Sequence, residues 1–201
     1  MIAIVDYDAG NIMSVQNALE KLGTEAILTR DKEILLAADK VILPGVGSFG
    51  DAMSNINRYG LADTIKEIVN KGTDFLGVCL GMQIMFEASE EAPGVEGLGL
   101  LKGRVRRIPT GEYKKIPHMG WNSVKLPKKE RLFADIPEDS YVYFVHSYYV
   151  DALDKSVVAA TTDYNVLIDA AVEKDNIFGC QFHPEKSSEV GLKILSNFIN
   201  G

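Results

Sequence analysis

The chain has 201 residues, a formal net charge of −7 at pH 7 and an isoelectric point near 5.0. This acidic balance argues against nucleic acid as a partner. No apolar stretch approaches the roughly 20 residues that span a bilayer, so we expect no membrane association. The first residues lack the features of a secretory signal and the chain has two cysteines, which favours a reducing cytoplasm. The length predicts a single domain over residues 1–201.

Strand and helix patterns alternate in the first half of the chain. Apolar residues at helical spacing predict helices at 11–22, 51–57 and 61–71, and short apolar runs predict buried strands at 1–5, 25–29, 40–43 and 73–78. Asn11 is a natural cap for the first helix. The alternation predicts an α/β fold of flavodoxin-like type, with a mainly parallel central sheet flanked by helices.

The second half of the chain is richer in strand patterns. Residues 92–99 predict a glycine-rich loop, and strands at 101–108 and 116–126 are expected to form a meander with a turn near Gly111. Ser187 or Ser188 is expected to cap a closing amphipathic helix. Further strands are expected at 141–149, 157–161, 166–172 and 177–182, and the C-terminal half is expected to add antiparallel strands to the sheet.

Cys79 lies between Gly77 and Gly81, where the strand predicted at 73–78 meets a helix predicted over 80–87. Glycines on both sides of a nucleophile permit a tight strand-to-helix turn, the nucleophile elbow. A helix N-terminus favours the thiolate form of a cysteine, and the amide of Leu80 would point toward a developing oxyanion. The alternative is that Cys79 is a buried structural thiol.

A glycine-rich loop at 44–53 follows the strand predicted at 40–43. Its glycines make backbone amides approachable at the carboxyl end of a sheet, where α/β folds place their sites. The glycine spacing does not fit G-x-G-x-x-G, and no Lys-Ser/Thr pair follows. We therefore expect no nucleotide at this loop.

His183 and Glu185 follow the last predicted strand. Extended geometry would put both side chains on one side, so that His183 accepts the proton of Cys79 and later protonates a leaving amine while Glu185 orients the imidazole. Along the strand itself, Phe178, Cys180 and Phe182 alternate onto one face. This alternation predicts that Cys180 is a buried structural thiol.

The segments around Cys79 and His183 resemble the class I, or triad-type, glutamine amidotransferases, in the expected order and over nearly the full chain. The finer match, to the glutaminase subunits of imidazole glycerol phosphate synthases in histidine biosynthesis, rests on residues 44–53, 118–122, 145–148 and 183–187. The resemblance implies that Cys79 attacks the glutamine carboxamide to form a thioester and release ammonia, with His183 and Glu185 completing the triad. It implies no cofactor and no metal.

Further roles are implied by the same resemblance. Leu80 would supply one oxyanion amide, and the Val46–Gly47 peptide would supply the second after rearranging. Glutamine would be held by residues at four matching positions: Gly47, Gln83, Ser147 and Tyr148.

The family also implies a partner, a (β/α)8-barrel cyclase subunit that takes the ammonia through an internal passage within a heterodimer. Four residues match positions near that interface: Asn11, Trp121, Tyr143 and Lys186. The alternative is that Asn11 only caps its helix and Lys186 is only solvated. One departure from the family pattern is Asp8, which stands where the family usually has glycine.

Two other functions remain open at this point. One is a different triad glutaminase, such as the glutaminase of pyridoxal phosphate synthesis. The other is a non-catalytic α/β binding module that kept an elbow cysteine.

Overall fold

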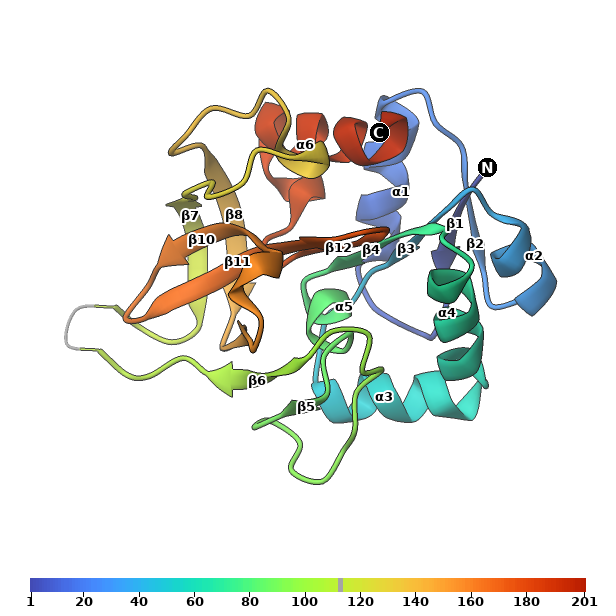
Figure 1. The fold of residues 1–201 in the computed structure, drawn as a ribbon, viewed down its shortest axis with the longest axis horizontal. Helices are drawn as coiled ribbons and strands as arrows, with labels where there is room; N and C mark the ends of the chain where they lie inside the picture. The colour runs from blue at the N-terminus through green and yellow to red at the C-terminus, as the bar shows by residue number, and fades with distance from the viewer. Residues whose placement is uncertain (112–113) are drawn as a thin grey trace.

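The computed structural model describes residues 1–111 and 114–201, and its centre is a sheet of seven strands (Figure 1). The strand order is β10-β11-β12-β4-β3-β1-β2. Five neighbouring strands run parallel: β12 (Ile177–Cys180), β4 (Asp74–Val78), β3 (Lys40–Leu43), β1 (Ile2–Val5) and β2 (Ala26–Thr29). Antiparallel pairing adds β11 (Leu167–Lys174) and β10 (Val158–Asp163) at one edge. The predicted α/β sheet with additional antiparallel strands is confirmed.

Helices cover both faces of this sheet because its strands are apolar on both sides. Ile2 and Ile4 of β1 pack with α1 (Ile12–Lys21) and α6 (Ser188–Asn200), whereas Ala3 and Val5 face the opposite cluster. That second cluster includes residues of α2 (Lys32–Ala37), α3 (Phe49–Arg58), α4 (Leu61–Asn70) and α5 (Leu80–Gln83). Continuous burial of this kind is typical of parallel strands between two helical layers. Figure 1 shows α1 and α6 on one side of the sheet and α3, α4 and α5 on the other.

The helix expected over 80–87 ends at Gln83 instead. Ile84, Met85 and Phe86 are all completely buried, so this stretch has no polar helical face to present to solvent. Their carbonyl groups accept from the loop that follows, for example Leu98 N–H to the Ile84 oxygen at 2.8 Å. The chain then enters the short strand β5 (Ala88–Ser89).

The predicted meander of strands 101–108 and 116–126 is wrong. Strand β6 (Gly103–Arg107) pairs with β5 and β9 (Tyr148–Ala152), whereas β7 (His118–Ser123) pairs with β8 (Tyr141–His146). The strand expected over 141–149 is accordingly broken at Ser147, because the residues before it and after it pair with different strands. The Ser147 carbonyl accepts from Ile108 N–H at this break.

Short 3₁₀ turns complete the chain: η1 (Arg131–Phe133), η2 (Lys155–Val157) and η3 (Pro184–Lys186).

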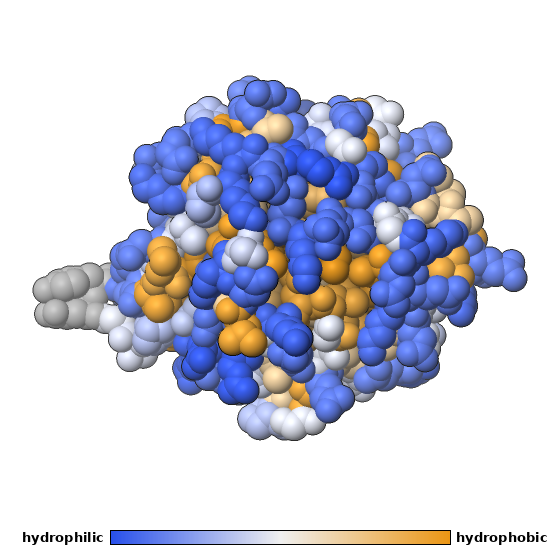
Figure 2. Space-filling model, in the orientation of Figure 1, coloured by the Kyte–Doolittle hydropathy of each residue, from blue (hydrophilic) through white to orange (hydrophobic). Residues whose placement is uncertain are grey.

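Figure 2 shows that the visible surface is mainly hydrophilic, with hydrophobic residues gathered toward the middle of the view. Among the described residues, every helix is too short or too polar to cross a membrane.

Candidate active site

The candidate site lies where four neighbouring parallel strands end at one edge of the sheet. Cys79 follows β4, His183 comes shortly after β12, and the loops after β3 and β1 carry residues 44–48 and 6–11. Parallel α/β sheets place ligands at the carboxyl ends of their strands. The strand order therefore brings together segments from both ends of the chain.

Cys79 occupies a strained backbone conformation, with φ 55° and ψ −112°. A non-glycine residue there costs on the order of 1–3 kcal/mol. A side chain at Gly81 would collide with the Leu43 carbonyl, and one at Gly77 would collide with Gly81 and the Met85 sulfur. The turn is so tight that both positions need glycine, as expected of a nucleophile elbow. The Cys79 N–H donates to the Cys180 carbonyl at 2.7 Å, which ties the elbow to β12.

His183 Nδ1 meets Glu185 Oε1 at 2.7 Å, and both side chains are almost completely buried. The expected extended path between them is wrong, because the chain turns into η3 at Pro184 directly after His183. The tight turn brings the carboxylate back to the ring. His183 N–H donates to the Tyr143 carbonyl at 2.9 Å, which ties the turn to β8.

The charge state of His183 depends on its two neighbours in the triad. Burial by itself lowers the pKa of His183, but the nearby Cys79 thiol and the Glu185 carboxylate outweigh burial and raise it to about 9. His183 Nε2 is buried, and among the described residues it has no partner in hydrogen-bonding geometry. The atom that would exchange a proton with Cys79 is thus left free.

Asn11 was expected to cap α1, and this expectation is wrong. Its backbone is left-handed, with φ 65°, and its side chain makes no capping hydrogen bond. The side-chain amide instead donates to Glu185 Oε1 at 2.8 Å, and Ser14 Oγ donates to Asn11 Oδ1 at 2.8 Å. A residue expected to cap its helix, and implied by the family resemblance to lie near a partner interface, therefore contacts the expected triad.

The side chain of Ser187 also departs from its expected capping role. Its hydroxyl donates to the His183 carbonyl at 2.6 Å and accepts from Tyr143 N–H at 2.9 Å. Ser187 is the N-cap residue of α6 by position, but its side chain makes no capping hydrogen bond, and Ser188 is the first helical residue. The buried hydroxyl of Ser187 holds the backbone beneath His183.

A cavity of about 300 Å³ opens beside the Cys79 side chain. This volume is typical of a small-molecule site. All four residues expected to hold glutamine line it, as do Val46 and Leu80 of the expected oxyanion groups: Val46, Gly47, Leu80, Gln83, Ser147 and Tyr148. Gly47 has φ 104°, and Leu80 begins α5, so that its N–H has no acceptor within the helix.

The amide of Gln83 is held in one orientation by two acceptors. Its Nε2 donates to the Tyr148 carbonyl at 2.8 Å and to Gln181 Oε1 at 2.9 Å. Gln181 Nε2 in turn lies 3.8 Å from Cys79 Sγ. Both N–H groups of the Gln83 amide are used inside the protein, which leaves Oε1 as the atom that can accept from a ligand in the cavity.

Two titratable side chains to which the sequence gave no individual role also line the cavity, His146 and Glu91. Glu91 Oε2 accepts from Phe49 N–H, at the start of α3, at 2.8 Å. A helix over 80–87 would carry Glu91 away from the elbow, so the expected helix gave no reason to place Glu91 at the site. The acidic residues that follow Gln83 are visible in the sequence, but they indicate a carboxylate near Cys79 only because α5 ends at Gln83.

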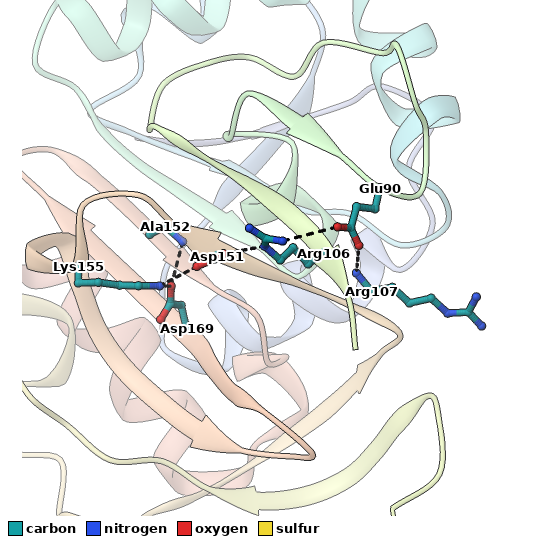
Figure 3. Close-up of polar contacts among 7 residues, drawn as sticks. All are labelled: Glu90, Arg106, Arg107, Asp151, Ala152, Lys155 and Asp169. Atoms are coloured by element: carbon teal, nitrogen blue, oxygen red, sulfur yellow. Dashed lines mark hydrogen bonds and ion pairs between the residues drawn. The ribbon is translucent and has the colours of Figure 1, made fainter. Parts of the chain in front are cut away.

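Ion pairs hold the loop that carries Glu91. Figure 3 shows Arg106 between Glu90 and Asp151, with Arg106 Nε 2.6 Å from Asp151 Oδ2. Glu90 Oε2 also accepts from Arg107 N–H at 2.9 Å. Lys155 extends this arrangement to the buried Asp169 carboxylate, at 2.8 Å. The loop is therefore tied to β6, β9 and β11.

Three of the residues expected at a partner interface contact or adjoin His183 or Glu185: Asn11, Tyr143 and Lys186. Trp121 and Tyr143 are cross-strand neighbours on β7 and β8, with ring centroids 6.0 Å apart, and Trp121 is 53% exposed. Lys186 is exposed on η3, one residue after Glu185. Asn11 is half-buried because it reaches Glu185.

Asp8 also has a left-handed backbone, with φ 63°, a conformation that glycine adopts without strain. Its carboxylate pairs with Arg30 at 2.6 Å and accepts a hydrogen bond from the Tyr59 hydroxyl. These two bonds, the Tyr59 bond first, lower the pKa of Asp8. Side-chain partners thus stabilise a loop conformation that a glycine would adopt freely.

Cys180 is completely buried within the same apolar cluster as Phe178 and Phe182, which confirms the predicted structural thiol. Burial raises the pKa of its thiol far above the usual range. It is therefore unsuited to act as a nucleophile.

Comparison with known proteins agrees with this geometry. Residues 3–200 match the family model described as glutamine amidotransferase class-I. The chain is 51% identical over 199 residues to the imidazole glycerol phosphate synthase subunit HisH of Methanocaldococcus jannaschii, covering 99% of this chain and 98% of that protein. It is 52% identical over 204 residues to the HisH subunit of Geobacillus sp. (strain WCH70), covering 100% of this chain and 96% of that protein.

Among solved structures, PurLQS from Thermotoga maritima matches with a TM-score of 0.77 at 24% identity, covering 99% of this chain and 97% of that chain. This likeness shows the fold. The family match and the two relatives together span nearly all of the sequence, including every residue of the candidate site. This chain belongs to the class-I glutamine amidotransferase family, in the group formed by the HisH subunits of imidazole glycerol phosphate synthase.

Proposed function

We propose that this chain is the glutaminase subunit of an imidazole glycerol phosphate synthase, which hydrolyses L-glutamine to glutamate and ammonia. One observation carries the proposal: Cys79, at the elbow, lines a cavity and lies beside the buried, hydrogen-bonded pair of His183 and Glu185. The chain is about 50% identical to HisH subunits over its whole length, and this identity supports a role in histidine biosynthesis. The same identity disfavours the alternative glutaminase of pyridoxal phosphate synthesis.

In the first step, the Cys79 thiol passes its proton to His183, and the resulting thiolate attacks the side-chain carbonyl carbon of glutamine. The oxygen of the resulting tetrahedral adduct becomes an oxyanion, which the N–H of Leu80 stabilises. The peptide between Val46 and Gly47 supplies a second donor after it rearranges. Gly47 favours such a change because it already has a positive φ.

In the second step, the adduct collapses as His183 donates its proton to the leaving nitrogen, so that ammonia departs and a thioester remains on Cys79. Water, deprotonated by His183, then attacks the thioester carbonyl. This releases glutamate and returns the thiol. Glu185 holds the imidazole in the required orientation throughout, and Asn11 holds Glu185.

Polar groups on several sides of the cavity suit the amino-acid end of the substrate. The Glu91 carboxylate is the cavity-lining group with the charge that attracts an α-ammonium. The Gln83 side-chain oxygen accepts from the substrate, and Gly47, Ser147 and Tyr148 line the same cavity.

Released ammonia is lost once it is protonated in bulk water, so its consumer must be close. We assign that role to a (β/α)8-barrel cyclase subunit in a cytoplasmic heterodimer, which receives ammonia through an internal passage. One face of β7 and β8 supports this docking surface, because it carries large apolar side chains: Met119, Trp121 and Tyr141, which are exposed, and Tyr143, which is half-buried. We assign to Lys186, which is exposed on η3, a pairing with an acidic residue of the barrel.

The proposal is tested by glutamate release from glutamine, measured for the chain alone and with the cyclase subunit carrying its nucleotide ligand. A large rise in the complex supports a glutaminase gated by its partner. High activity of the chain alone points to a different amidotransferase, and no activity in either state favours a non-catalytic binding module. Cys79→Ala is expected to abolish glutamine-dependent turnover while it preserves partner binding and ammonia-dependent synthesis.

A further inference from the structure

Two buried histidines outside the triad form a hydrogen-bonded chain that ends in the cavity. His146 Nδ1 lies 2.8 Å from the Tyr148 carbonyl oxygen, and His146 Nε2 lies 3.0 Å from His118 Nδ1. The other nitrogen of His118, Nε2, is 3.4 Å from Asn122 Nδ2. The Tyr148 carbonyl is the same group that accepts from Gln83 Nε2.

The carbonyl at the end of this chain determines where the protons lie. A carbonyl oxygen only accepts, so His146 must carry its hydrogen on Nδ1. In the neutral ring, Nε2 is then an acceptor, and His118 must donate to it from Nδ1. His118 Nε2 is left as an acceptor, which suits the Asn122 amide because Asn122 Oδ1 already accepts from Ser123 N–H at 3.0 Å.

The surroundings keep both rings neutral. Burial, followed by the influence of His146 and Lys114, lowers the pKa of His118 to about 3. Burial likewise lowers the pKa of His146 to about 4, with a further contribution from the nearby His183, although its bond to the Tyr148 carbonyl opposes the shift. Each ring therefore donates one hydrogen bond and accepts one at neutral pH.

Aromatic stacking also fixes the position of the His118 ring. His118 is stacked between Phe144, at 4.5 Å between ring centroids, and Tyr164, at 3.8 Å. It lies on the buried face of β7, whose opposite face exposes Met119 and Trp121. His118 does not line the cavity, whereas His146 and Tyr148 do.

We propose that His118 and His146 form a positioning relay that orients the Tyr148 carbonyl and, through it, the Gln83 amide toward the substrate glutamine. The carbonyl holds one N–H of Gln83, and Gln181 holds the other, so the relay determines which atom of Gln83 faces the cavity. This inference rests on the proposed function, because it concerns binding of the same substrate. It assigns to His118 an effect on glutamine binding without contact with glutamine.

The first test is the tautomer of each ring, read from the imidazole nitrogen shifts of protein labelled with ¹⁵N-histidine. The chain has three histidines, so single substitutions assign every signal. We expect His118 and His146 to be neutral Nδ1–H tautomers that do not titrate between about pH 5.5 and 9. An Nε2–H tautomer of either ring overturns the relay, and this result does not depend on glutaminase activity.

The second test separates substrate binding from turnover. His118→Phe keeps the stacked ring and removes the donor, so KM for glutamine should rise about three- to tenfold, the loss of one neutral hydrogen bond, with kcat within about twofold. His118→Asn keeps a donor close to the position of Nδ1 and should restore most of the KM. Both variants are measured in the state, alone or with the cyclase subunit, in which the parent chain releases glutamate.

Thr162→Val is the matched control, since it removes a buried hydrogen bond from β10 to the Ser123 carbonyl of β7, the strand of His118, and leaves every hydrogen bond of His118 and His146 in place. It should lower the melting temperature and leave KM unchanged. An unchanged KM in folded His118→Phe, or an equal rise in Thr162→Val, overturns the proposal. If the parent chain releases no glutamate in either state, the proposed function fails, and the tautomers alone decide whether the relay exists.

Discussion

Asn11 donates its side-chain amide to Oε1 of Glu185 at 2.8 Å, although the two residues are 174 positions apart in the sequence. The same carboxylate oxygen contacts His183 Nδ1. Glu185 Oε2 is buried and has no partner among the described residues. The amide of Asn11 is thus the neutral donor that helps to hold the triad carboxylate in place, and this relationship leads to the first prediction.

Replacing Asn11 with alanine should lower kcat for glutamine hydrolysis by about tenfold, because a buried carboxylate that loses a donor costs on the order of 1–3 kcal/mol and is free to turn away from His183. Asn11→Asp should be more harmful, since it places a second carboxylate against the first. Steady-state kinetics with the cyclase subunit present measure the effect. Asn17→Ala, at an exposed position of α1, is the control. Equal kcat values for Asn11→Ala and Asn17→Ala would contradict the assignment.

The raised pKa of His183 predicts a pH dependence of stability. The folded-state pKa of about 9 lies above the unfolded value of about 6.5, so the contribution is complete below about pH 6.5 and is lost as the pH rises through about 9. Between those limits, the free energy of unfolding should fall by on the order of 1–3 kcal/mol relative to His183→Gln. Urea unfolding of both proteins at several pH values gives the difference. Identical slopes would show that the pKa of His183 is not raised in the folded protein.

The strained backbone of Cys79 predicts that glycine is more stable there than alanine. At φ 55° and ψ −112° a Cβ is unfavourable, so Cys79→Gly should exceed Cys79→Ala in free energy of unfolding by about 1 kcal/mol. Elsewhere, Gly for Ala usually destabilises. Both variants should lack glutaminase activity. Thermal unfolding of the two variants compares their stabilities. A more stable alanine variant would mean that the backbone at position 79 is not strained.

Glu91→Gln tests the assignment of the α-ammonium site. The change keeps the size of the side chain and an acceptor for Phe49 N–H, but it removes the charge. A hydrogen bond between charged groups contributes about 1.5–3 kcal/mol, so KM for glutamine should rise about ten- to a hundredfold while kcat changes little. Glu96→Gln, exposed in the same loop, is the control. If KM is unaffected by Glu91→Gln, another group binds the ammonium.

Local patterns predicted much of this protein. The first four strands and helices α1, α3 and α4 follow from runs of apolar residues and their spacing, and the predicted strands at 40–43 and 73–78 agree with β3 and β4 to within one residue. The Cys79 elbow follows from two glycines that are needed for close backbone approach. These features depend on residues adjacent in sequence, so the sequence alone carries them.

Other features depend on which segments meet. Strands 103–107 and 118–123 take different partners, and the break at Ser147 exists only because those partners diverge. Nothing local distinguishes a helix that continues past Gln83 from one that ends there to bury Ile84, Met85 and Phe86. Pairing and burial are decided by the packing of distant side chains.

The sequence by itself therefore indicated the alternation of strands and helices in the first half of the chain, the elbow cysteine, and the histidine and glutamate proposed to act with it. The tertiary structure decided that Asn11 serves Glu185 rather than its own helix, that Glu91 reaches the cavity, and that His118 and His146 are joined in one chain. The physical reason is that each of these contacts requires a donor and an acceptor from segments far apart in sequence. Their distance and orientation exist only after the sheet has assembled.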